Sequence, residues 1–195
     1  MVKDHFKTRG YIEGGIVSNI NHEAMDMEAL PPFLRALLVT DGTVTKILEA
    51  FFWEKIRVEM RWQEQVWLKE PLPLMEAKAG DFAIERDVKL VGTDSEDIYA
   101  YATSYILTDS LEDEIKSQLI KGKIGIGELL REIGLETYRE IADFGRQIYR
   151  TNEKDDAEPN FVEVIYRTYV INIGGKPAIQ ITERFPYRLF QKKAM

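Results

Sequence analysis

Two charged residues occupy strand positions where the alternating pattern calls for apolar side chains. In residues 82–90 apolar and charged side chains alternate, and Arg86 falls within the apolar set. Near the C-terminus Glu183 likewise stands between Ile181 and Phe185. Because side chains along a strand point alternately to opposite faces, Arg86 and Glu183 are both expected to point toward the core. A buried charge needs a partner, so these two residues are the candidate catalytic pair.

Two interpretations of this pair stay open at the level of strand patterning. Arg86 and Glu183 could form a buried ion pair with a structural role only. Alternatively, they line a closed apolar cavity that holds one cation and one acid. Such a cavity suits a small carboxylated ring, because Arg86 would bind a carboxylate in fork geometry. Glu183 would then exchange a hydrogen bond or a proton with a hydroxyl group of the same ligand.

The dipeptide Gly174-Gly175 predicts a tight hairpin between strands at 161–173 and 177–185. A symmetric two-residue turn would place Tyr166 opposite Glu183, which makes Tyr166 a candidate substrate-binding residue.

The remaining chain predicts an α+β fold built on an antiparallel sheet of about six strands. Periodicity and turn signals indicate further strands at 55–68, 82–91 and 98–107. They also indicate two helices within 31–52, separated by Asp41-Gly42, and helices at 111–121 (ending at Gly122), 128–133 and 136–149.

Length and charge limit the classes of function. We expect the 195 residues to form a single domain, 1–195, with 1–29 as an N-terminal extension and 30–188 as the core. The net charge of −7 argues against a nucleic-acid surface, which is normally basic. Because neither a signal peptide nor a membrane-spanning apolar run is apparent, we expect a cytoplasmic protein with no membrane association.

The residue types also argue against several kinds of site. The absence of cysteine excludes disulfides, thiolate nucleophiles and cysteine-bound zinc. The two histidines, His5 and His22, are too isolated to suggest a metal site. Glu112 and Asp113, and the run Glu153 to Glu158, are interpreted as solvated charge, so no metal site is predicted.

The segment GKIGIG, residues 122–127, has the spacing of a phosphate-binding loop but lacks a preceding strand. We interpret its glycines instead as exposing backbone N–H groups at the start of helix 128–133, where an anion can bind.

Several ordered segments resemble the chorismate pyruvate-lyase superfamily, in particular its divergent archaeal and bacterial branch. The resemblance runs from about Leu30 to Arg188 and rests on LLVTDGTVTKILEA, FAIERDVKL, YATSYI, IGIGELL and GGKPAIQITERFP. It implies an antiparallel sheet with helices on one side and a buried site beneath two helical flaps. It also implies elimination of pyruvate from chorismate to leave 4-hydroxybenzoate, with no cofactor and with the small-molecule substrate as the partner.

The resemblance carries site roles onto particular residues. It implies that Arg86 binds the ring carboxylate together with the Ile126 N–H, that Gly127 belongs to the same substrate-binding segment, and that Glu183 is the acidic site residue. Val44 falls where better-known members have a pocket-lining methionine.

One departure concerns positive charge. Ser104 falls where those members carry a second arginine, although chorismate has two carboxylates, and Lys46 is a candidate replacement.

Two other functions remain open on the sequence. The first is a non-catalytic domain that senses small aromatic acids, since the same fold serves in transcription regulators. We expect such a regulator to carry a winged-helix domain ahead of the fold, and only about 30 residues precede it here. The second is a lyase or isomerase that acts on a related cyclohexadiene acid.

Overall fold

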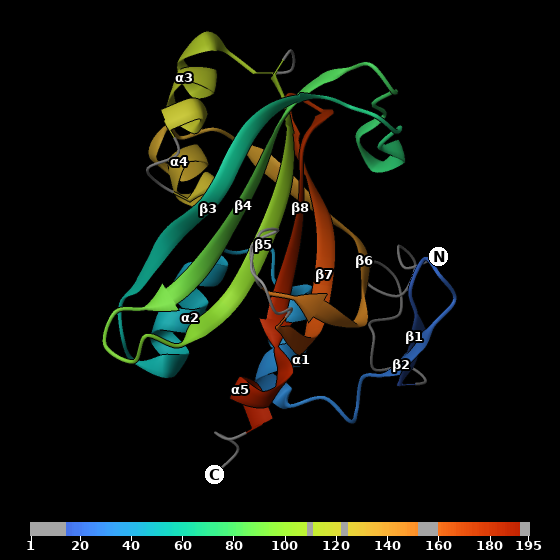
Figure 1. The fold of residues 1–195 in the computed structure, drawn as a ribbon, viewed down its shortest axis with the longest axis vertical. Helices are drawn as coiled ribbons and strands as arrows, with labels where there is room; N and C mark the ends of the chain where they lie inside the picture. Colours follow the sequence, from blue (N-terminus) through green and yellow to red (C-terminus); the bar gives the residue numbers. More distant parts are fainter. Residues whose placement is uncertain (1–14, 109–110, 122–124, 152–159, 192–195) are drawn as a thin grey trace.

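One six-stranded antiparallel sheet organises the chain (Figure 1). A computed structural model describes residues 15–108, 111–121, 125–151 and 160–191. The strands lie in the spatial order β3-β4-β5-β8-β7-β6. Their bounds are β3 Ile56–Trp67, β4 Phe82–Gly92, β5 Ile98–Leu107, β6 Thr137–Arg150, β7 Phe161–Ile173 and β8 Lys176–Pro186. The five strands predicted from the sequence are confirmed to within one or two residues.

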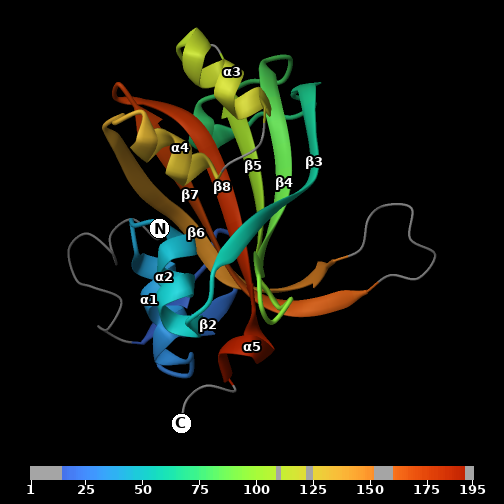
Figure 2. The same cartoon turned by 90° about the vertical axis from the view of Figure 1, so that its left-hand side faces the viewer.

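The helix pairs α1–α2 and α3–α4 lie on one face of this sheet, as Figure 2 shows. They are α1 Pro32–Val39, α2 Val44–Phe52, α3 Asp113–Lys121 and α4 Ile126–Glu132. The short helix α5 Tyr187–Gln191 follows β8, a 3-10 turn η2 covers Pro73–Met75, and a small hairpin joins β1 Ile16–Ser18 to β2 Ala24–Asp26. The predicted α+β class, with an antiparallel sheet and helices on one side, is confirmed.

Two apolar clusters attach the helices to the sheet. The pair α1–α2 packs through Leu34, Leu37 and Leu48 against sheet residues that include Ile165 and Phe185. The pair α3–α4 packs against another part of the same face through a second cluster, which contains Ile115, Leu119, Leu129, Leu130, Ile171, Ile179 and Ile181. Burial of apolar side chains is the main stabilising contribution in both clusters. The space between the two helix pairs therefore lies over the middle of the sheet.

The helix predicted for residues 136–149 is wrong, because this segment is strand β6. The prediction relied on Ile141, Phe144 and Ile148, which are spaced as on one face of a helix. In β6 a bulge at Ala142 interrupts the pairing with β7. One extra residue reverses the alternation of faces, so Ile141 and Phe144 both join the core cluster beneath α1 and α2. Ile148 is 67% exposed.

Some predictions concern residues outside those that the structure describes. His5, Gly122 and the run Glu153 to Glu158 belong to this group. Within the described ranges, no helix combines the length and the apolar character that crossing a membrane requires.

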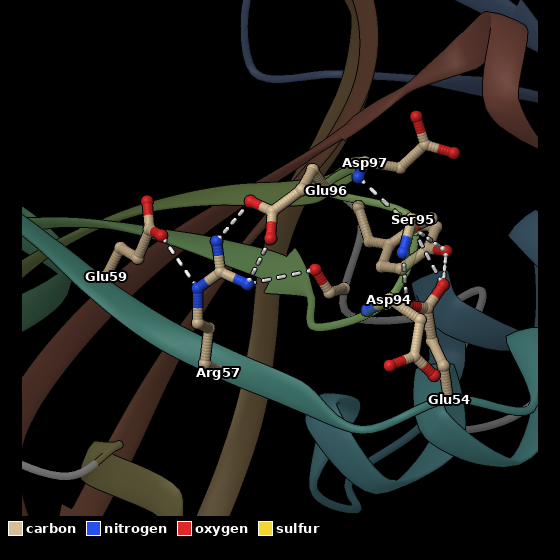
Figure 3. Close-up of polar contacts among 9 residues, drawn as sticks. Glu54, Arg57, Glu59, Asp94, Ser95, Glu96 and Asp97 are labelled. Carbon is tan, nitrogen blue, oxygen red and sulfur yellow. Dashed lines mark hydrogen bonds and ion pairs between the residues drawn. The ribbon is translucent and has the colours of Figure 1, made fainter.

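The turn between β4 and β5 is built around the carboxylate of Glu54 (Figure 3). This carboxylate accepts hydrogen bonds from the backbone N–H groups of Asp94 and Ser95, each at 3.0 Å, and from the Ser95 hydroxyl at 2.8 Å. The Tyr99 hydroxyl also donates to it. A side chain at Gly92 would come within 2.5 Å of Glu54 Oε2, which explains the glycine at this position. Together these donors, Tyr99 first among them, lower the pKa of Glu54 from 4.5 to about 2.

This lowered pKa predicts a specific acid sensitivity. Glu54 contributes stability that is present above pH 4.5 and is lost as the pH falls toward 2, because the unfolded chain then binds the proton more readily. Glu54→Gln should reduce the free energy of unfolding near pH 7 by about 1 kcal/mol and should flatten this part of the pH profile. Urea unfolding across the acid range measures both effects, with Glu59 changed to Gln as the control. Parallel profiles for wild type and Glu54→Gln would contradict the assignment.

Candidate active site

A cavity of about 150 Å³ lies on the helix-bearing face of the sheet, between the two helix pairs. The turn before α2 and the start of α4 line it on one side, through residues 42–46 and 125–128. Strands β3, β4, β5, β6, β7 and β8 supply the other walls, including the apolar residues Ile56, Val58, Val88, Leu90, Ala102 and Ile181. A cavity of this size can hold a single aromatic ring.

Arg86 and Glu183 both line this cavity. Arg86 lies on β4 opposite Ser104 of β5, and Glu183 lies on β8 opposite Ala102 of β5. They therefore lie two strands apart, and their positions differ by two residues along the direction of β5. Ordinary strand spacings then place their Cα atoms about 12 Å apart. Arg86 is 2% exposed and Glu183 is 7% exposed. Burial lowers the pKa of Arg86.

The carboxylate of Glu183 is held by two residues of β7. Arg167 Nε donates to Glu183 Oε2 at 2.8 Å, and the Tyr169 hydroxyl donates to Oε1 at 3.2 Å. The Arg167 guanidinium also lies 4.9 Å from the centre of the Tyr169 ring. Glu183 thus pairs with Arg167 rather than with Arg86, which removes the interpretation of Arg86 and Glu183 as each other's structural partner. Burial, followed by the charge of Glu183, raises the pKa of Tyr169.

The predicted pairing of Tyr166 with Glu183 is wrong. The symmetric register holds only next to the turn, because β8 has a bulge at Ala178. Beyond the bulge Tyr166 pairs with Arg184, and its hydroxyl donates to Asp143 at 2.9 Å on the other face of the sheet. Tyr169, which the sequence analysis did not select, lines the cavity.

The other predicted binding residues all border the same cavity. Val44, Ser104, Ile126 and Gly127 are among its lining residues. Lys46 also lines it, but its side chain is 59% exposed and forms an ion pair with Glu49 at 3.1 Å.

Two arginines attach the turn between α1 and α2 to the sheet. Arg167 Nη1 donates to the backbone carbonyl of Thr40 at 2.5 Å, and Arg139 Nη1 donates to that of Asp41. Arg139 comes from β6 and lines the cavity, whereas the sequence analysis assigned its segment to a helix. Arg131 of α4 is a further cavity-lining cation, 52% exposed and 4.0 Å from Glu128.

A second buried polar cluster lies on the opposite face of the sheet. Arg61 Nη1 contacts Asp87 Oδ1 at 3.1 Å, and Arg184 Nη1 donates to the Thr103 hydroxyl at 2.9 Å. The Tyr149 hydroxyl donates to Asp87 at 3.4 Å. Because none of these residues lines the cavity, they provide matched controls for variants within it.

Solved structures share this fold at low sequence identity. PhnF from Mycobacterium smegmatis gives a TM-score of 0.52 at 9% identity, over 76% of this chain and 65% of that chain. A transcriptional regulator of the GntR family from Bacillus cereus gives 0.51 at 9% identity, over 68% and 92%. The topology is that of the chorismate lyase-like fold.

Sequence relatives specify the family. The chorismate pyruvate-lyase of Mycobacterium leprae (strain TN) is 30% identical over 170 residues, which cover 81% of this chain and 76% of the relative. The putative lyase MJ0807 of Methanocaldococcus jannaschii is 32% identical over 157 residues, covering 79% and 78%. The family model described as chorismate pyruvate-lyase Rv2949c-like matches residues 38–193. The chain therefore belongs to the Rv2949c-like chorismate pyruvate-lyase family.

Proposed function

We propose that this protein eliminates pyruvate from chorismate and leaves 4-hydroxybenzoate. The observation that carries the proposal is a cavity that combines apolar walls with a buried guanidinium, Arg86, and a buried carboxylate, Glu183. An aromatic or cyclohexadiene acid with a carboxylate and a hydroxyl matches these groups. Family membership supports the same reaction.

In this proposal Arg86 binds the ring carboxylate through two parallel hydrogen bonds. The N–H of Ile126 assists from the start of α4, where Gly127 leaves the backbone unobstructed. Ser104, next to Arg86 across the strands, offers a hydroxyl to the same part of the ligand. Val44 and the apolar strand residues contact the faces of the ring.

Glu183 accepts a hydrogen bond from the 4-hydroxyl group of the substrate. Each carboxylate oxygen can accept more than one hydrogen bond, so the bonds from Arg167 and Tyr169 leave capacity for the ligand. Arg167 and Tyr169 act as positioning residues, because they fix the orientation of Glu183.

The reaction is an elimination that makes the ring aromatic. The bond between C3 and the ether oxygen breaks, C4 loses its proton, and enolpyruvate leaves and tautomerises to pyruvate. Aromatisation supplies driving force, so the protein contributes mainly by orienting the substrate and by stabilising the negative charge that develops on the departing enolate.

Incubation with chorismate tests this proposal. We expect pyruvate to form at a rate proportional to protein concentration, as measured by coupled oxidation of NADH with lactate dehydrogenase. The Arg184→Gln variant, altered on the opposite face, should keep this activity. Binding of 4-hydroxybenzoate without any release of pyruvate would contradict the lyase assignment and favour a domain that senses aromatic acids.

A further inference from the structure

Arg139 differs from Lys46 and Arg131, two other cations that line the cavity, in what balances its charge. Lys46 and Arg131 are each more than half exposed and lie within 4.0 Å of a carboxylate on their own helix. Glu183 balances Arg167. Among the residues that the structure describes, Arg139 forms no ion pair, and its Nη1 donates to a backbone carbonyl. A carboxylate in the cavity would therefore meet a guanidinium that no acid among the described residues neutralises.

The position of Arg139 is fixed by its surroundings. Its strand pairs it with Ile171 of β7, on the face that carries Tyr169 and the cavity. Its Nη2 lies 3.4 Å from the place where a side chain at Gly127 would begin. Its Nε is buried and has no hydrogen-bond partner among the described residues. The guanidinium is thus held between the turn before α2 and the first turn of α4, with donor capacity left over.

We propose that Arg139 binds the second carboxylate of a dicarboxylate substrate, the carboxylate of the ether-linked side chain that leaves. This inference rests on the proposed function. It concerns a second group of the ligand, the carboxylate of the leaving side chain, and a residue on another strand than Arg86. Arg86 binds the ring carboxylate from β4, whereas Arg139 reaches the leaving group from β6. Arginine suits this role because its planar fork matches a carboxylate and stays charged. Arg139 would thereby supply the positive charge that Ser104 lacks.

The role predicts selectivity for dicarboxylates, which two stable ligands can measure. One is 3-(carboxymethoxy)-4-hydroxybenzoate, and the other is 3-ethoxy-4-hydroxybenzoate, which has a methyl group in place of the second carboxylate. Arg139→Gln should raise the Kd of the dicarboxylate about 10- to 100-fold, as expected for the loss of hydrogen bonds to a charged group. The Kd of the monocarboxylate should stay within about twofold. Isothermal titration calorimetry gives both values.

Two further variants separate binding from structure. Arg139→Lys keeps the charge and should recover part of the affinity for the dicarboxylate. Arg131→Gln, at the exposed rim of the cavity, should change neither Kd by more than about twofold. Equal weakening of both ligands by Arg139→Gln would overturn the proposal, because it would indicate a structural role through Asp41. An unchanged Kd for the dicarboxylate would overturn it as well.

The assay with chorismate distinguishes this inference from the proposed function. If wild type releases pyruvate and Arg139→Gln leaves the KM for chorismate unchanged, the lyase proposal stands and the role of Arg139 fails. If wild type releases no pyruvate but Arg139→Gln selectively weakens the dicarboxylate, the carboxylate site stands and the lyase proposal fails.

Discussion

Arg86→Gln is expected to remove most of the stabilisation of the protein by 4-hydroxybenzoate. For wild type, ligand at about 100 times its Kd adds about 2.7 kcal/mol to the free energy of unfolding. At this chain length such a gain raises Tm by roughly 5–10 °C. Arg86 is buried in the cavity wall, and losing one partner of a buried charge pair costs about 2 kcal/mol or more. The Kd should therefore rise at least about 30-fold, and the shift in Tm at the same ligand concentration should fall to about a third of the wild-type shift or less.

Arg184→Gln is the matched control for this measurement. Arg184 also projects from the central strands, and burial likewise lowers the pKa of its guanidinium, but it donates to Thr103 on the opposite face. We expect Arg184→Gln to lower the Tm of the free protein and to keep the full shift on ligand addition. An equal ligand-induced shift in wild type and Arg86→Gln would rule out Arg86 as the residue that binds the carboxylate.

Glu183→Gln is expected to affect both stability and turnover. The change removes the negative partner of buried Arg167, and breaking a buried ion pair costs about 3–5 kcal/mol. This corresponds to a fall in Tm of roughly 6–20 °C. The rate of the chemical step should fall at least about 10-fold through the lost charge-assisted hydrogen bond to the 4-hydroxyl. It should fall about 10²–10⁴-fold where Glu183 also accepts the proton.

Asp87→Asn separates these two effects. Asp87 forms a buried ion pair with Arg61 on the opposite face. Burial raises the pKa of the Asp87 carboxyl, and the positive charge of Arg61 offsets part of this rise. The variant loses a comparable buried charge without touching the cavity. We expect reduced stability with an unchanged rate of the chemical step. A normal single-turnover rate in Glu183→Gln would show that the carboxylate serves only the fold.

The parity of apolar residues along strands was sufficient to predict that Arg86 and Glu183 line one cavity. Arg86 and Glu183 each interrupt an apolar series, and their inward direction follows from the alternation of faces alone. The same patterning placed five of the six sheet strands and the helix pair α1–α2. These features are local, because each depends on neighbouring residues of one segment.

The register between β7 and β8 could not be predicted from the alternation of faces. β7 is apolar on both faces along much of its length, so its own sequence does not show which face bears Tyr166 or Tyr169. The deciding feature is the bulge at Ala178, which moves Arg167 opposite Glu183. Pro177 was a usable signal, since proline within a sheet favours bulges.

Arg139 was missed for a related reason. The bulge at Ala142 gave β6 an apolar spacing that resembles that of a helix, and the segment was therefore not searched for inward-facing charge. In both cases one extra residue in a strand changed the face on which a functional candidate lies.

The central claim is that the cavity bearing Arg86 and Glu183 converts chorismate, and a single-turnover experiment tests it most directly. Protein in molar excess is mixed with chorismate, and samples quenched over time are analysed for chorismate, pyruvate and 4-hydroxybenzoate. Excess protein makes the result independent of slow product release from an enclosed site. The account predicts that chorismate disappears in one exponential phase and that pyruvate and 4-hydroxybenzoate appear in equal amounts at the same rate. Intact chorismate, or its conversion without release of pyruvate, would contradict it.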